Sequence, residues 1–318
     1  MSILRAARVA SVTLCLMAVF PVFASTEERP PHSFRVTVSG HGPAVILIPG
    51  LASSGDTWKT TVARYQDRFE CHVLTLAGFA GTPPIAEPLL AAVRAELPEY
   101  IRSRHLNRPI VIGHSLGGTL AMAVAADHPD IVGPLVVVDM VPFLGGSALG
   151  ASSLAEVQPR IAAMRAGMDA ISDAQWAESA KSGASVKYMV TSPADLTTII
   201  GWSVASDRHA VTNALADVYG TDLRQDVARI QTPVLALSTW KGVHDEVVAA
   251  AKVDISREAF MGVFTAQFAK LPRLHFVLSD AARHFIMFDD PAWFFRQLDA
   301  FLADPDAAVR VRGFDDGK

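Results

Sequence analysis

The chain has 318 residues, half of them hydrophobic and only 19% charged, with a net charge of −4. This length and composition suit one large α/β domain whose core needs no disulfide bonds. The chain has no basic run and no interleaving of basic and aromatic residues, so the sequence argues against nucleic-acid binding.

The first 24 residues have the layout of an export signal. Arg5 and Arg8 precede the apolar stretch VASVTLCLMAVF, and small residues surround Ala24. The stretch is shorter than the roughly 20 residues of a membrane span, so we expect cleavage after Ala24 rather than an uncleaved anchor. Lipidation of Cys15 is a minor alternative, because a bulky leucine precedes it. The mature protein is expected in the periplasm or outside the cell, without a stable membrane anchor.

Short apolar runs of strand length continue along most of the chain. FRVTV (34–38) and AVILI (44–48) flank the turn sequence SGHGP, which predicts a hairpin. Other runs are apolar on both faces, which is typical of buried strands in a parallel sheet. These runs are 71–76, 109–113, 134–139, 233–238 and 274–279.

Helical patterns alternate with these runs, at 56–68, 88–104, 116–127 and 291–303. The alternation predicts an α/β fold with a mostly parallel central sheet flanked by helices. In such folds the ligands bind at the carboxyl ends of the strands.

One long segment interrupts the alternation. Residues 140–228 contain no convincing strand, and Ile161, Met164 and Met168 follow a helical spacing. A structureless loop of this length would be improbable, so the segment is expected to form a helical cap over the carboxyl edge of the sheet. The predicted organisation is a signal peptide (1–24), a core in two parts (25–139 and 229–303), a helical cap (140–228) and a C-terminal tail (304–318).

The sequence GHSLGG begins at Gly113, directly after the apolar run RPIVI. Gly113, Ser115 and Gly117 match the pattern G-x-S-x-G, a sharp strand-to-helix turn that exposes a nucleophilic serine. A tight structural turn is the alternative. The strand before the serine and the glycine-rich helix start after it favour the catalytic interpretation.

A serine nucleophile needs a base, an orienting carboxylate and donors for the developing oxyanion. The sequence ILIPGLASSGDTW places Leu51 at the end of the apolar run 44–48. The backbone N–H groups of Leu51 and Leu116 could therefore form an oxyanion hole. An ordinary glycine turn after the strand is the alternative for Leu51.

The chain resembles the α/β-hydrolases that use a serine nucleophile. The resemblance rests on the segments GHGPAVILIPGLASSGDTW, VIGHSLGGTLAMAVAADHPD, TPVLALSTW and ARHFIMFDDPAWFFRQLDAFL, which occur in the family's order. They cover most of residues 34–303, and Pro49-Gly50 replaces the family's His-Gly pair at the oxyanion turn. The resemblance implies the α/β-hydrolase fold. The nearest resemblance is to exported bacterial members of unassigned substrate.

The resemblance also implies the chain order serine, acid, histidine. His284 lies after the run 274–279 and before a helical pattern, where the family places its base. The family's acid usually follows the strand that is 233–238 here, and Asp245 is the first acid after it. Asp139, at the alternative position used by some relatives, and Asp254 remain open, with Asp245 preferred. Asp139 could instead cap backbone groups at a strand end.

Large apolar residues of the cap could line a substrate pocket, or they could form the core of the cap itself. They are Phe143, Met164, Met168 and Trp176, with Met189 and Trp202 as further members. We expect a small-molecule substrate: a small or medium, fairly apolar carboxylic ester that passes through an acyl-enzyme, without a metal or another cofactor. The alternatives are a cofactor-free peroxidase, an acyltransferase, or a non-catalytic binding protein. The oligomeric state is left open.

Overall fold

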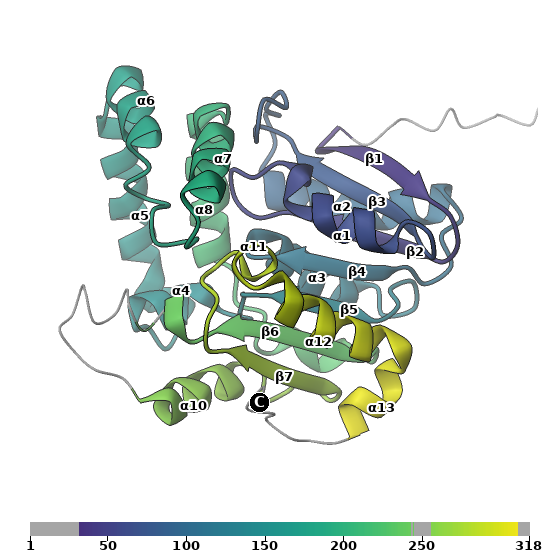
Figure 1. Ribbon diagram of the computed structural model, residues 1–318. Helices are drawn as coiled ribbons and strands as arrows, with labels where there is room; N and C mark the ends of the chain where they lie inside the picture. Colours follow the sequence, from purple (N-terminus) through teal and green to yellow (C-terminus); the bar gives the residue numbers. More distant parts are fainter. Residues whose placement is uncertain (1–31, 243, 245–255, 311–318) are drawn as a thin grey trace, which may run out of the picture.

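The computed structural model describes residues 32–242, 244 and 256–310. These residues fold around a central seven-stranded sheet with helices on both faces (Figure 1). The strands are β1 (Phe34–Gly40), β2 (Ala44–Ile48), β3 (Glu70–Leu76), β4 (Ile110–His114), β5 (Leu135–Val138), β6 (Val234–Thr239) and β7 (Leu274–Ser279). Their order is β1-β3-β2-β4-β5-β6-β7. β1 pairs antiparallel with β3, and the other pairings are parallel. The predicted fold class is confirmed.

The predicted hairpin is wrong, because β3 lies between the two runs that were expected to pair. The turn between β1 and β2 packs against the residues that lead into β3. A β-carbon placed on Gly40 would lie 2.4 Å from the carbonyl oxygens of Gln66 and Phe69, and the His41 N–H donates to Gln66 O at 3.3 Å. The turn therefore supports the entry of β3 between β1 and β2.

The strands β2 to β7 bury most of both faces, as the continuous apolar runs indicated, whereas β1 at the edge of the sheet is largely exposed. Along β2, Ile46 and Ile48 belong to one core cluster, while Val45 and Leu47 belong to another. The first cluster includes residues of α2 (Leu89–Ser103), α3 (Leu116–Asp127) and α10 (Arg257–Gln267). The second includes residues of α1 (Lys59–Tyr65), α11 (Ile286–Asp289) and α12 (Pro291–Ala303), which α13 (Pro305–Arg310) follows. Short 3-10 helices span Gly55–Trp58 and Asp226–Arg229.

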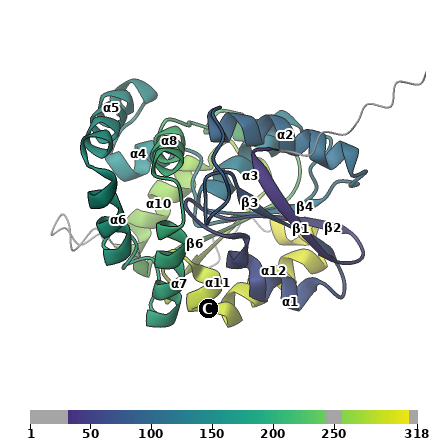
Figure 2. The ribbon, with the colours of Figure 1, turned by 90° about the horizontal axis from the view of Figure 1, so that it is seen from above.

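Five α-helices and the second 3-10 helix connect β5 to β6, and we call residues 144–219, which contain the five α-helices, the helical insertion. The five α-helices are α4 (Leu144–Leu149), α5 (Leu154–Ala170), α6 (Asp173–Ser182), α7 (Pro193–Val204) and α8 (Arg208–Tyr219). Hydrogen bonds join the insertion to the loop after β3, from Gly81 N to Ala205 O (2.9 Å) and from Asp207 N to Gly78 O (2.8 Å). Figures 1 and 2 show α5 to α8 standing beside the sheet. The insertion therefore borders the carboxyl edge, where this fold class binds ligands.

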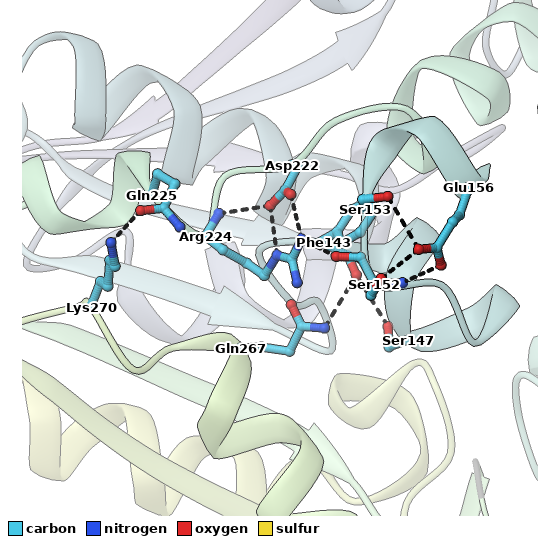
Figure 3. Close-up of polar contacts among 10 residues, drawn as sticks. All are labelled: Phe143, Ser147, Ser152, Ser153, Glu156, Asp222, Arg224, Gln225, Gln267 and Lys270. Carbon is cyan, nitrogen blue, oxygen red and sulfur yellow. Dashed lines mark hydrogen bonds and ion pairs between the residues drawn. The ribbon is translucent and has the colours of Figure 1, made fainter. Parts of the chain in front are cut away.

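A polar network secures the start of the insertion at Phe143 (Figure 3). The Phe143 carbonyl accepts hydrogen bonds from Gln267 Nε2 and Ser147 Oγ, each at 3.4 Å. The Arg224 guanidinium lies 4.4 Å from the centre of the Phe143 ring, and Asp222 holds that guanidinium at 2.9 and 2.6 Å. Residues before, within and after the insertion thus meet at one point.

Among the described residues, no helix has the length and apolar character of a membrane span.

Candidate active site

Ser115 stands between β4 and α3 in a conformation that residues with a side chain rarely adopt. Its φ is 53° and its ψ is −123°. Such a backbone conformation costs about 1–3 kcal/mol and persists only where the surroundings enforce it. The Ser115 N–H donates to Val138 O at 2.9 Å, which holds the residue at the end of β5. The serine is partly exposed, whereas its neighbours His114 and Leu116 are buried.

The flanking glycines permit this turn because there is no room for a side chain beside it. A β-carbon placed on Gly113 would lie 2.1 Å from the carbonyl oxygen of Gly117. A β-carbon on Gly117 would lie 2.3 Å from the carbonyl oxygen of Ile48. Both positions of the motif therefore need glycine, because the start of α3 lies directly against β4 and β2.

Asp139 and His284 form a short contact at the same edge of the sheet. His284 Nδ1 lies 2.6 Å from Asp139 Oδ2. The other carboxylate oxygen of Asp139 accepts hydrogen bonds from Ser238 Oγ at 2.9 Å and from the Thr239 N–H at 3.2 Å. With the Nδ1 proton directed at the carboxylate, the neutral imidazole keeps Nε2 free to accept a proton.

Among the described residues, Asp139 is the acid that the structure brings to the candidate base. The preferred acid Asp245 and the alternative Asp254 both lie outside the described residues. The pairing of β4 with β5 brings Asp139 to this place. His114 pairs with Val138, so the residues that follow them, Ser115 and Asp139, leave the sheet side by side.

The two candidate oxyanion donors lie on segments that flank Ser115. A β-carbon on Gly50, the residue before Leu51, would lie 3.1 Å from the Cβ of Ser115. Leu116 is the first residue of α3, and the first N–H groups of a helix have no acceptor within that helix. The positive end of the helix dipole adds to the attraction for a developing negative charge.

The segment that carries His284 is hydrogen-bonded to the helical insertion. The Phe285 N–H donates to Met189 O at 3.1 Å. Asp289 Oδ1 accepts from the N–H and the hydroxyl of Thr191 at 2.7 and 2.8 Å, and Oδ2 accepts from the Arg283 N–H at 2.8 Å. Sequence reasoning missed this role of Asp289, because no local pattern indicates a contact between residues 98 positions apart.

The apolar residues expected in a substrate pocket have different environments. Phe143 is completely buried in a cluster with Val157, Ile161 and Ala216, and Met164 packs against that cluster. Trp176 is partly buried against the main core. Met189 and Trp202 are partly buried against the core cluster that contains Phe285. Met168 is partly exposed, and its carbonyl accepts from Arg208. The structure therefore places Phe143 and Met164 in or against the insertion's own core.

A cavity of about 490 Å³ lies elsewhere, between α2, α3, α5 and α8. Its lining includes Leu120, Ile161 and Asp217, but not Ser115, Asp139 or His284. This cavity is therefore not evidence for or against a site at those three residues.

Across the described part of the chain, no three His, Cys, Asp or Glu residues are grouped to hold a metal ion.

Residues 45–297 match the sequence model of the Alpha/beta hydrolase family. The match covers most of the chain, and the fold agrees with it, so the protein belongs to the Alpha/beta hydrolase family.

Curated relatives resemble part of the chain. An uncharacterized protein of Mycobacterium tuberculosis is 29% identical over 146 residues, which make up 45% of this chain and 40% of that protein. A pimeloyl-(acyl-carrier protein) methyl ester esterase of Vibrio vulnificus is 30% identical over 109 residues, or 34% of this chain and 41% of the esterase. The similarity thus spans about two fifths of the length of these relatives.

Solved structures extend the similarity over nearly the whole fold. The enol-lactonase from Burkholderia xenovorans LB400 has a TM-score of 0.65 at 16% identity, covering 85% of this chain and 96% of that chain. The esterase from Exiguobacterium antarcticum has a TM-score of 0.65 at 15% identity, covering 85% and 95%. At this identity the likeness establishes the fold. The family and the relative that is named as an esterase support a hydrolase.

Proposed function

We propose that the protein is a serine hydrolase that cleaves a small or medium, fairly apolar carboxylic ester. Ser115 is the nucleophile, His284 the base and Asp139 the orienting acid. The observation that carries this proposal is the 2.6 Å contact between Asp139 Oδ2 and His284 Nδ1, beside the strained turn at Ser115. A carboxylate-bound imidazole beside a partly exposed serine is the arrangement that activates a hydroxyl for acyl transfer.

In the proposed reaction, Ser115 Oγ attacks the ester carbonyl carbon while His284 Nε2 takes the hydroxyl proton. The carbonyl oxygen becomes an oxyanion, which the N–H groups of Leu51 and Leu116 stabilise. Losing one such donor typically costs about 10²- to 10³-fold in rate. Collapse of the intermediate breaks the bond to the alkoxide, which leaves with the proton from His284, and an acyl-serine remains.

Water then completes the cycle. His284 Nε2 takes a proton from a water molecule, whose oxygen attacks the acyl-serine carbonyl. The second intermediate releases the carboxylic acid and returns the proton to Ser115 Oγ. Asp139 holds the imidazole in the required tautomer and stabilises its charged form in both halves of the reaction.

The substrate class rests on two supports. Trp176, Trp202 and Met189 give the insertion apolar side chains that are only partly buried against the core. The Vibrio vulnificus relative is named as an esterase of a methyl ester. Export to the periplasm or the cell exterior is part of the proposal. It rests on the pattern in residues 1–24, which lie outside the described residues.

Labelling with a fluorophosphonate probe tests the proposal, because the probe reacts with activated serines. The mature protein should be labelled, and the Ser115→Ala variant should not. A panel of p-nitrophenyl esters from acetate to octanoate should be hydrolysed only by the protein with Ser115. A folded protein that neither reacts with the probe nor cleaves any ester would contradict the proposal.

A further inference from the structure

His114 is a completely buried polar residue between the candidate nucleophile and the candidate base. It is the last residue of β4, directly before Ser115, and its side chain has no exposed surface. The centre of its ring lies 4.6 Å from the ring of His284 and 4.6 Å from the ring of Phe285. On its other side, a β-carbon placed on Gly50 would lie 3.1 Å from His114 Nδ1. The imidazole thus lies beside Gly50 and packs against the segment that carries His284.

One polar contact joins His114 to the base segment. His114 Nε2 lies 3.0 Å from the backbone carbonyl oxygen of His284. Because a carbonyl can only accept a hydrogen bond, the Nε2 atom carries the proton. The hydrogen bond therefore runs from the strand that presents Ser115 to the backbone of the base itself.

The charge state agrees with this role. Burial keeps the pKa of His114 well below 6.5, and His284 lowers the same pKa further when it is protonated, while the hydrogen bond to the His284 carbonyl acts in the opposite direction. A neutral ring with its proton on Nε2 leaves Nδ1 unprotonated. Among the described residues, no hydrogen-bond partner reaches His114 Nδ1. An unsatisfied buried polar atom is costly, so mere filling of this space would favour an apolar side chain.

We infer that His114 is a positioning residue for His284. Its Nε2–H group fixes the backbone carbonyl of His284, and thereby the distance of that imidazole from Ser115, the residue next to His114. This inference rests on the proposed function. A misplacement of about 1 Å can lower the rate of an enzyme about 100-fold, so one hydrogen bond to the base segment can matter far beyond its contribution to stability.

Two substitutions separate positioning from packing. His114→Gln keeps an N–H donor at the same number of bonds from Cβ as Nε2, whereas His114→Leu fills a similar volume without a donor. We expect His114→Leu to lower kcat by about 10- to 100-fold with little change in KM. His114→Gln should restore most of kcat. Melting temperatures measured by circular dichroism should be similar for the two variants.

The rate of fluorophosphonate labelling gives a second measurement that does not depend on the ester chosen. It should fall in His114→Leu and recover in His114→Gln. If the leucine variant does not fold, His114→Asn replaces it, because the amide of asparagine ends one bond short of the Nε2 position.

The outcomes separate this inference from the proposed function. Equal activity loss in the Gln and Leu variants, or none in the Leu variant, would overturn the positioning role while Ser115-dependent labelling of the wild-type protein persists. An unlabelled wild-type protein would overturn the proposed function and this inference with it.

Discussion

Asp139 and His284 are 145 residues apart in the sequence, yet Asp139 Oδ2 lies 2.6 Å from His284 Nδ1. Asp139 follows β5, and the two groups that bind its other oxygen come from the end of β6. His284 lies on the segment after β7. Three adjacent parallel strands therefore end at this contact, and the order of the sheet creates it.

Replacing Asp139 with asparagine should lower kcat by about 10³- to 10⁴-fold, because an amide stabilises the wrong imidazole tautomer. The matched control is Asp245→Asn, which should leave kcat within a few-fold of the wild-type value. Steady-state hydrolysis of a p-nitrophenyl ester measures both. The reverse pattern would return the acid to Asp245.

Replacing His284 with alanine should lower kcat by several orders of magnitude while the protein stays folded. Since Ser115 and His284 are proposed to act as one unit, the double variant Ser115→Ala/His284→Ala should be little worse than either single variant. Kinetic assays at high enzyme concentration, with circular dichroism as the folding control, check this. Additive losses would indicate that the two residues act independently.

Replacing Ser115 with glycine should abolish activity but stabilise the fold by about 1 kcal/mol. Glycine adopts a φ of 53° without strain, and the relief outweighs the extra entropy of the unfolded chain. Ser115→Ala keeps the strain and is the control. Urea denaturation measures the free energy of unfolding of both variants. Equal stability would show that the turn is not strained.

Replacing Gly117 with alanine should destabilise the protein by about 1–3 kcal/mol, because the added methyl group would collide with the Ile48 carbonyl. Gly167 in α5 is a suitable control, since a β-carbon there meets nothing within 4 Å. Gly167→Ala should raise stability by about 0.5–1 kcal/mol through its higher helix propensity. Thermal unfolding compares the two, and a neutral Gly117→Ala would contradict the packing argument.

Local patterns predicted most of the fold. Runs such as AVILI are apolar at every position because both faces of β2 are buried, and periodicity reveals this directly. The pairing of β1 was missed because it depends on how the turn at Gly40 packs against residues before β3. Strand neighbours are a tertiary property, whereas the strand itself is a local one.

In the candidate site, too, some residues follow from local patterns, whereas others depend on tertiary structure. The serine candidate comes from a motif that is contiguous in sequence, and the histidine candidate comes from its place between a strand pattern and a helical pattern. The choice of acid depends on which strand ends stand beside each other, so Asp139 could only be an alternative. For Phe143 the sequence left a pocket position and a core position open, because apolar residues of a core and of a binding site look alike in sequence, and packing buries it completely.

The carboxylate of Asp289 has a consequence for how the insertion can move. It binds the backbone next to His284 with one oxygen and Thr191 with the other, and Met189 binds Phe285 nearby. Movement of residues 189–191 away from the sheet therefore breaks three hydrogen bonds to the segment that carries the base. These hydrogen bonds couple the position of residues 189–191 to the placement of the segment that carries His284.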